Sequence, residues 1–122
     1  MGDWIKGQIL ELTASGAISK GKKVTVVSNF SQSDREKGST VTCRFQGYSY
    51  EITSTHLTEV KDPMWKKGQV AVIIESGALS TGTHLTIERD FSVEDLNRGN
   101  SVQCKHNNET FSVSPHHLGD PN

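Results

Sequence analysis

The sequence is poor in the features that mark specialised classes of protein. Two cysteines in 122 residues are too few for a disulfide-stabilised scaffold. No apolar run approaches the roughly 20 residues of a membrane-spanning helix, and Met1–Trp4 lacks the basic and apolar regions of a secretion signal. The net charge of −1 gives no overall attraction to nucleic acid or acidic lipid. We therefore expect a globular, cytoplasmic protein.

What the sequence does contain is an internal repeat. When the chain is shifted by 61 residues against itself, eighteen aligned positions carry the same residue type. These positions are Trp4, Lys6, Gly7, Gln8, Ser15, Gly16, Ala17, Ser19, Gly21, Thr25, Phe30, Ser31, Asp34, Gly38, Val41, Cys43, His56 and Leu57, each with its counterpart 61 residues later. Such a period predicts two copies of one structural unit. We expect a first unit over residues 1–60, a linker over 61–63 and a second unit over 64–122, held in a fixed relation by the short linker.

Each unit has the pattern of short β-strands separated by polar turns. Apolar runs over residues 9–12 and 70–74 predict the first strand of each copy. The second strands alternate, so that Val24 and Val26 are expected to face inward and Thr25 and Thr86 outward. Two further strands in each copy, over 41–45 and 48–52 and over 102–106 and 109–113, flank hairpin turns at 46–47 and 107–108. A short fifth strand is expected over residues 58–60.

A short helix is predicted between the second and third strands of each unit. Residues 31–38 and 92–99 both begin with serine, carry an acidic residue three positions later and end with glycine. This order is typical of a capped helix of one or two turns.

Because strands this short would leave exposed edges in a flat sheet, we expect a mainly β chain of two small five-stranded barrels.

The order of these elements resembles the Src-homology-3-like small barrel. Residues 18–26 resemble the diverging turn and second strand of that family, and residues 52–57 resemble the strand, one-turn helix and apolar residue that close its barrel. The resemblance implies a binding role, since bacterial, Tudor and KOW-type barrels bind cell wall, modified peptides, nucleic acid or polymerase. The third strands open at Thr40 and Ser101, where peptide-binding members carry tryptophan, so polyproline binding is not expected.

Catalysis and metal binding are not predicted. Cys104, His106, His116 and His117, with His84 nearby, are residue types that bind zinc, but Phe45 in the first copy matches His106 and favours a packed ring at that position. His56 and His117 recur without a recognisable nucleophile or carboxylate pair. Cys43 and Cys104 are interpreted as small apolar core residues, and a disulfide between them would require symmetric packing of the repeats. We expect no cofactor and no metal.

One candidate function is nucleic-acid binding by the first unit. Lys20, Lys22, Lys23 and Arg44 could contact phosphates, and Phe45 and Tyr48 could stack on bases. Residues 1–61 hold eight Lys or Arg against six Asp or Glu, whereas residues 62–122 hold five against eight. Only the first unit therefore has a basic character.

The preferred candidate is protein binding, as an adaptor or inhibitor. Val70, Val72 and Ile74 make the first strand of the second copy apolar on both faces, whereas Glu11 and Thr13 occupy two of these positions in the first copy. This extra apolar face could dock on the first unit, dimerise or hold a partner, and we favour docking on the first unit. Trp4 and Trp65 either plug the barrel ends or, if exposed, anchor an interface.

Overall fold

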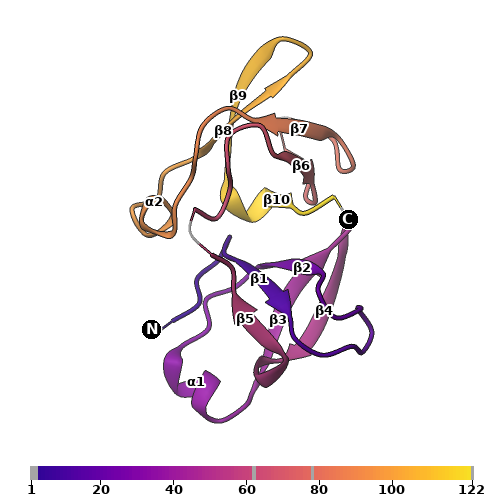
Figure 1. Ribbon diagram of the computed structural model, residues 1–122, viewed down its shortest axis with the longest axis vertical. Coiled ribbons are helices and arrows are strands. Elements are labelled where there is room, and N and C mark those ends of the chain that lie inside the picture. Colours follow the sequence, from indigo (N-terminus) through magenta and orange to yellow (C-terminus); the bar gives the residue numbers. More distant parts are fainter. Residues whose placement is uncertain (1–2, 62, 78, 122) are drawn as a thin grey trace.

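The protein consists of two five-stranded antiparallel sheets, one in each repeat. A computed structural model describes residues 3–61, 63–77 and 79–121. The two sheets follow one another along the long axis of the molecule (Figure 1). The predicted mainly β architecture with two similar units is therefore confirmed.

The two sheets have the same strand order. The first contains β1 (Ile9–Leu12), β2 (Lys23–Val26), β3 (Thr40–Phe45), β4 (Tyr48–Thr53) and β5 (Leu57–Glu59), in the order β4-β3-β2-β1-β5. The second contains β6 (Val70–Ile73), β7 (His84–Ile87), β8 (Val102–His106), β9 (Glu109–Val113) and β10 (Leu118–Gly119), in the order β10-β6-β7-β8-β9. In the described ranges, no ladder joins β4 to β5 or β9 to β10.

Short helical elements occupy equivalent places in the two repeats. The α-helices α1 (Gln32–Glu36) and α2 (Val93–Asn97) follow β2 and β7, and the 3₁₀ turns η1 (Ser54–His56) and η2 (Pro115–His117) precede the last strand of each sheet. Ser31 and Ser92 cap the α-helices by accepting hydrogen bonds from the main-chain N–H groups of Asp34 and Asp95, both at 3.1 Å. None of the helices in the described ranges is long and apolar enough to span a membrane.

The hairpin turns follow directly from local sequence. Gln46 and Gly47 have φ values of 51° and 87°, and Asn107 and Asn108 have 51° and 67°. Two successive residues with positive φ are what a tight two-residue hairpin needs, and Asn and Gly adopt this conformation most readily. The predicted hairpin turns are confirmed.

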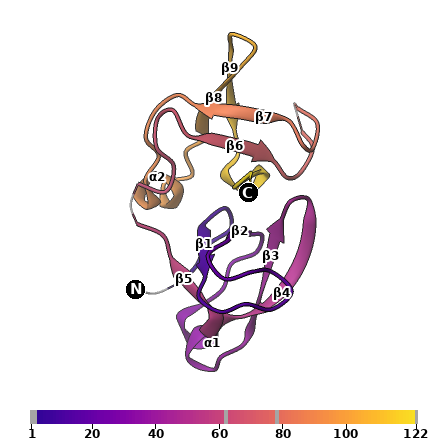
Figure 2. The same ribbon diagram turned by 45° about the vertical axis from the view of Figure 1, so that its right-hand side comes forward.

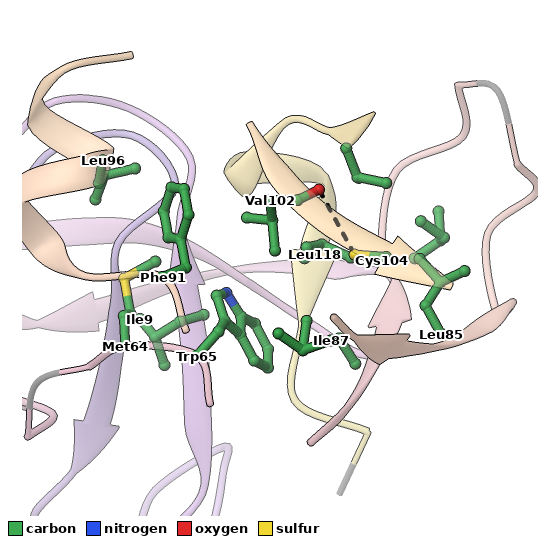
Figure 3. Close-up of a cluster of buried hydrophobic side chains, with 13 residues drawn as sticks. Ile9, Met64, Trp65, Leu85, Ile87, Phe91, Leu96, Val102, Cys104 and Leu118 are labelled. Carbon is green, nitrogen blue, oxygen red and sulfur yellow. Dashed lines mark hydrogen bonds between the residues drawn. The ribbon is translucent and has the colours of Figure 1, made fainter. Parts of the chain in front are cut away.

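Each repeat has its own hydrophobic core. Trp4 and Trp65, both 1% exposed, pair through main-chain hydrogen bonds with Phe30 and Phe91 respectively. Trp4 packs with the first core, and Trp65 packs with the second (Figure 3). Neither indole ring is a freely exposed anchor.

The two cysteines are free and buried in different cores. Burial, with a smaller contribution from Glu51, raises the pKa of the Cys43 thiol to about 12. Burial and then Glu88 raise the pKa of Cys104 to about 11. Both therefore remain protonated at neutral pH, as expected for packing residues.

Candidate functional site

The two repeats meet through two different surfaces. The first repeat contributes a face of β1 and β2, and the second contributes β10 and the neighbouring α2 (Figures 1 and 2). Thr25 Oγ1 donates a buried hydrogen bond of 2.7 Å to the Leu118 carbonyl oxygen. Lys23 Nζ lies 3.9 Å from Asp120 Oδ2 at the same junction. We call this contact the repeat junction.

Thr25 points outward from the first core, as the alternation in β2 predicts. It is nevertheless fully buried, because β10 covers that face of β2. Strand periodicity separates the two faces of a strand but does not say what lies against the polar one. The hydroxyl is tolerated there because it has a hydrogen-bond acceptor.

The chain before β1 inserts closely into the second repeat. Ile9 is 2% exposed and belongs to the second core, together with Trp65 and Leu96 (Figure 3). Gly7 has a φ of +95°, and a Cβ added there would lie 2.9 Å from Pro115 Cβ and 3.1 Å from His116 N. Only glycine combines this backbone conformation with so close an approach.

The pKa of His116, in the second repeat, is affected by a residue of the first repeat. Burial lowers the pKa of its imidazole, and the nearby His117 and Lys6 lower it further, against a smaller opposing effect of Glu75. Lys6 comes from the first repeat, so the charge of one repeat acts on an imidazole of the other. The neutral imidazole is the form that suits this position.

Replacing Thr25 by valine tests the buried hydrogen bond of the junction. The shape is kept while the donor to Leu118 is lost, so we expect the free energy of unfolding to fall by about 1–2 kcal/mol. Urea denaturation followed by circular dichroism measures the change. Thr86→Val is the matched control because Thr86 is the exposed equivalent in β7, and a change within about 0.5 kcal/mol is expected there. Equal losses in the two variants would contradict this role of Thr25.

The equivalent sheet face of the second repeat is open. We define the open sheet face by the exposed counterparts of the junction face of β1–β3, namely Val70, His84, Thr86 and Lys105. The strand register places Val70 opposite Thr86 and Val72 opposite His84. Val70 is 43% exposed, whereas its counterpart Ile9 is 2% exposed. One sheet face is thus covered in the first repeat and free in the second.

The three residues predicted for an inter-repeat or partner face, Val70, Val72 and Ile74, lie in different environments. Val72 and Ile74 are buried, at 8% and 1% exposure, and a Cβ added at Gly119 would lie within 4 Å of both Ile74 and Thr25, whereas Val70 is 43% exposed. The first repeat uses its own β1–β2 face and packs on β10 and α2. Of the three predicted residues, Val70 is therefore the one whose side chain remains accessible to a partner.

A hollow of about 420 Å³ lies on the first repeat. We call it the first-repeat hollow; its lining residues are Trp4, Gln32, Arg35, Glu36, Ser54, Thr55 and Leu57. The equivalent residues of the second repeat, 61 positions later, are Trp65, Val93, Leu96, Asn97, Pro115, His116 and Leu118. Ile9 shares a core with Trp65, Leu96 and Leu118, and Gly7 approaches Leu96, Pro115 and His116. The hollow is therefore the open equivalent of the surface that the first repeat covers on the second.

Polar groups of the first-repeat hollow distinguish it from its covered counterpart. The Arg35 guanidinium lies 4.2 Å from the centre of the Trp4 ring, and its Nη1 is 3.6 Å from Glu59 Oε2. Trp4 Nε1 donates to the same carboxylate oxygen at 2.9 Å. Ser54 Oγ is buried and has no hydrogen-bond partner among the described residues. In the second repeat, Leu96 stands in place of Arg35.

The predicted basic residues do not form one patch. Lys20 and Lys22 are exposed, but Lys23 faces Asp120 across the repeat junction. Arg44 lies opposite Thr25 in the β2–β3 ladder, on the face toward the second repeat, and its Nη1 donates to the Gly47 carbonyl oxygen at 3.4 Å.

The two predicted stacking rings lie in different environments. Phe45 is half-buried and contacts Tyr50 edge to face, with ring centres 6.5 Å apart. Tyr48, in contrast, is 71% exposed. Only Tyr48 offers an accessible ring.

Among the described residues, the histidines considered for metal binding do not gather into one group. His106 Nδ1 lies 3.2 Å from the His84 carbonyl oxygen, and His116 and His117 contact each other edge to face. Within residues 3–61, 63–77 and 79–121, no three His, Cys, Asp or Glu side chains converge in a ligand-like group.

Sequence reasoning missed Arg35, Ser54 and Glu59 in the hollow and Gly7 and Ile9 at the junction. A comparison of equivalent positions could have indicated the hollow. The first repeat has the polar residues Arg35 and Ser54 where the second has the apolar Leu96 and Pro115. No known protein family and no curated protein sequence matches this chain. Its function is therefore inferred from its own surfaces.

Proposed function

We propose that this protein is a non-catalytic protein-binding module that acts as an adaptor or inhibitor. The observation that carries the proposal is the contrast between Ile9 at 2% exposure and Val70 at 43% on equivalent sheet faces. In the first repeat, this face binds a folded unit. The same kind of face, with an exposed aliphatic side chain at its edge, remains available in the second repeat.

The proposal includes the small-barrel identity of each repeat. The five-stranded antiparallel order, the glycine turn before the second strand, and the 3₁₀ turn before the last strand support the Src-homology-3-like resemblance. In that view, η1 with β5 and η2 with β10 close the two barrels. Folds of this kind present binding surfaces on a stable framework, and function depends on the particular surface.

A fixed relation between the repeats supports an adaptor or inhibitor. The insertion of Ile9 into the second core and the buried Thr25–Leu118 hydrogen bond hold the units together. A rigid tandem loses little conformational freedom on binding, which favours affinity. The protonated, buried thiols of Cys43 and Cys104 suit a structural role and a reducing, cytoplasmic setting.

Nucleic-acid or nucleoprotein binding is the second candidate. It is supported by the exposed side chains of Lys20 and Lys22 and by Tyr48 at 71% exposure. These groups could contact phosphates and stack on a base. Such binding would weaken steeply as salt rises, because counterions are released from the nucleic acid.

An affinity comparison separates the two candidates. Immobilised wild-type protein, Val70→Glu and the double variant Lys20→Ala/Lys22→Ala are incubated with lysate of the source organism, and captured protein and nucleic acid are quantified. We expect one protein to be captured by wild type and by the lysine variant, and at least about tenfold less by Val70→Glu. Capture that is unchanged by Val70→Glu but lost in the lysine variant and in raised salt would replace protein binding by the second candidate.

A further inference from the structure

We propose that this protein binds a second copy of itself head to tail, with the open sheet face of one chain packed on the first-repeat hollow of the next. The inference rests on the proposed protein-binding function and names its partner. It starts from the fact that the repeat junction joins two unlike surfaces. One comes from β1, β2 and the preceding turn, and the other from β10, η2 and α2.

Each repeat carries both kinds of surface, so the tandem leaves one of each kind uncovered. In both views, α2 and β10 lie next to the first repeat, whereas α1 lies at the far end of the molecule (Figures 1 and 2). The uncovered hollow is beside α1, and the uncovered sheet face belongs to β6–β8. Unlike surfaces on one molecule produce head-to-tail association, which either closes into a ring or continues as a filament.

The turn that would enter the hollow is built like the one already seated at the junction. Gly68 has a φ of +90°, close to the +95° of Gly7, and no atom outside its chain neighbours lies within 4 Å of an added Cβ. Gln69 Oε1 accepts from Lys66 N at 2.9 Å, as Gln8 Oε1 accepts from Ile5 N at 3.1 Å. The Lys66–Val70 turn therefore already has the shape that Ile5–Ile9 uses in contact with the second repeat.

The contacts of the repeat junction predict specific contacts between two chains. Val70 would take the place of Ile9 and pack toward Trp4 and Leu57. Thr86 Oγ1 would donate to the Leu57 carbonyl oxygen, as Thr25 does to Leu118. The buried Ser54 Oγ, without a partner among the described residues, faces a hollow that polar groups of the Lys66–Val70 turn would enter.

Charge favours the same pairing. The open sheet face carries the cation Lys105, and, among the described residues, the first-repeat hollow has the carboxylates of Glu36 and the neighbouring Glu59 against the single cation Arg35. At the edge of the contact, His84 and Glu59 would occupy the places of Lys23 and Asp120, which lie 3.9 Å apart at the junction. Complementary charge of this kind orients association more than it strengthens it.

Two substitutions make the contact between chains weaker than the junction. On the surface of the first repeat, Arg35 stands at the position that the apolar Leu96 has in the junction. Thr58 stands at the position of Gly119, and Gly119 lies beside Thr25 in the junction. The junction also gains from the linker, which keeps its surfaces at a high effective concentration. Association is therefore expected to be reversible and to rise with protein concentration.

The test uses two variants that block opposite surfaces. Val70→Glu places a charge on the open sheet face, and Thr55→Trp fills the hollow from an exposed position on its rim. Sedimentation equilibrium of the full chain is measured from about 10 µM to 1 mM, the range in which weak contacts form. We expect the average mass of wild type to rise about twofold or more, and each variant alone to remain a monomer.

Mixing the two variants gives the decisive result. Val70→Glu retains a free hollow and Thr55→Trp retains a free sheet face, so the equimolar mixture should form a 1:1 dimer and grow no further. Tyr48→Glu is the matched control, since it adds the same charge at another exposed large side chain, 71% exposed, and should associate like wild type. Circular dichroism confirms that every variant is folded.

The outcomes separate this inference from the proposed function. A wild-type chain that stays monomeric throughout, or blocked variants that do not pair when mixed, overturns head-to-tail association. If Val70→Glu nevertheless abolishes capture of a different protein, the protein-binding function stands and only the identity of the partner is wrong. If neither self-association nor capture depends on Val70, both proposals fail.

Discussion

Replacing Val72 by glutamate is expected to unfold the second repeat. Val72 is 8% exposed and lies in β6 between the partners His84 and Gly119. A carboxylate at this position would lose most of its hydration without gaining a partner. Uncompensated buried charges cost about 3–5 kcal/mol, a large share of the stability of so small a unit. Urea denaturation by circular dichroism, together with the amide NMR signals of both repeats, measures the loss.

Val70→Glu is the matched control for this prediction. Val70 lies on the same face of the same strand, two residues away, but is 43% exposed. The introduced carboxylate can remain hydrated there, so a change within about 0.5 kcal/mol is expected. Similar destabilisation by the two substitutions would show that burial is not what separates these positions. An unchanged free energy of unfolding would also show that Val70→Glu is folded and can be used in the binding experiments.

Replacing Gly7 by alanine is expected to disrupt the repeat junction. The methyl group would lie 2.9 Å from Pro115 Cβ and 3.1 Å from the main-chain nitrogen of His116. The chain must shift, because η2 cannot move without disturbing the β10 strand that follows it. We expect overpacking to cost about 1–3 kcal/mol, in addition to about 1–2 kcal/mol for a side chain at positive φ.

Gly68→Ala is the control that separates the steric contact at the junction from the cost of a side chain at positive φ. Gly68 has nearly the same φ as Gly7, +90° against +95°, but an added methyl group there meets no atom within 4 Å. The difference between the two variants in free energy of unfolding therefore reports the contact between repeats alone. If Gly7→Ala and Gly68→Ala cost the same, the close approach of Gly7 to the second repeat does not form in solution.

Position 35 and its equivalent, position 96, diverge in a way that matches their different environments. Several core and turn positions, in contrast, keep their residue types, as the pairs Trp4 and Trp65 or Gly7 and Gly68 show. At the outer surface of α1, however, Arg35 packs over Trp4 and pairs with Glu59, whereas Leu96 at the equivalent position is buried beside the first repeat. A polar outer surface on a terminal repeat maintains solubility, as in other repeat proteins. It also leaves the hollow accessible.

The sequence by itself determined most of the local structure. The 61-residue period, the alternation in β2 and β7, the serine caps at Ser31 and Ser92, and the turn residues at 46–47 and 107–108 depend on neighbours within a few positions. Such preferences act through backbone conformation and nearby hydrogen bonds, which are encoded locally. The strands and turns were therefore predictable without knowing how the repeats meet.

Only the tertiary structure decided which surfaces are covered. Thr25 and Thr86 are the same residue in the same strand pattern, yet one is buried at the junction and the other exposed. Ile9 and Val70 differ in the same way, and neither strand segment by itself indicates which of the two side chains is covered. Burial at the junction depends on the relative placement of two units joined by a short linker. That placement is set by many weak contacts acting together, and no single segment of the chain encodes it.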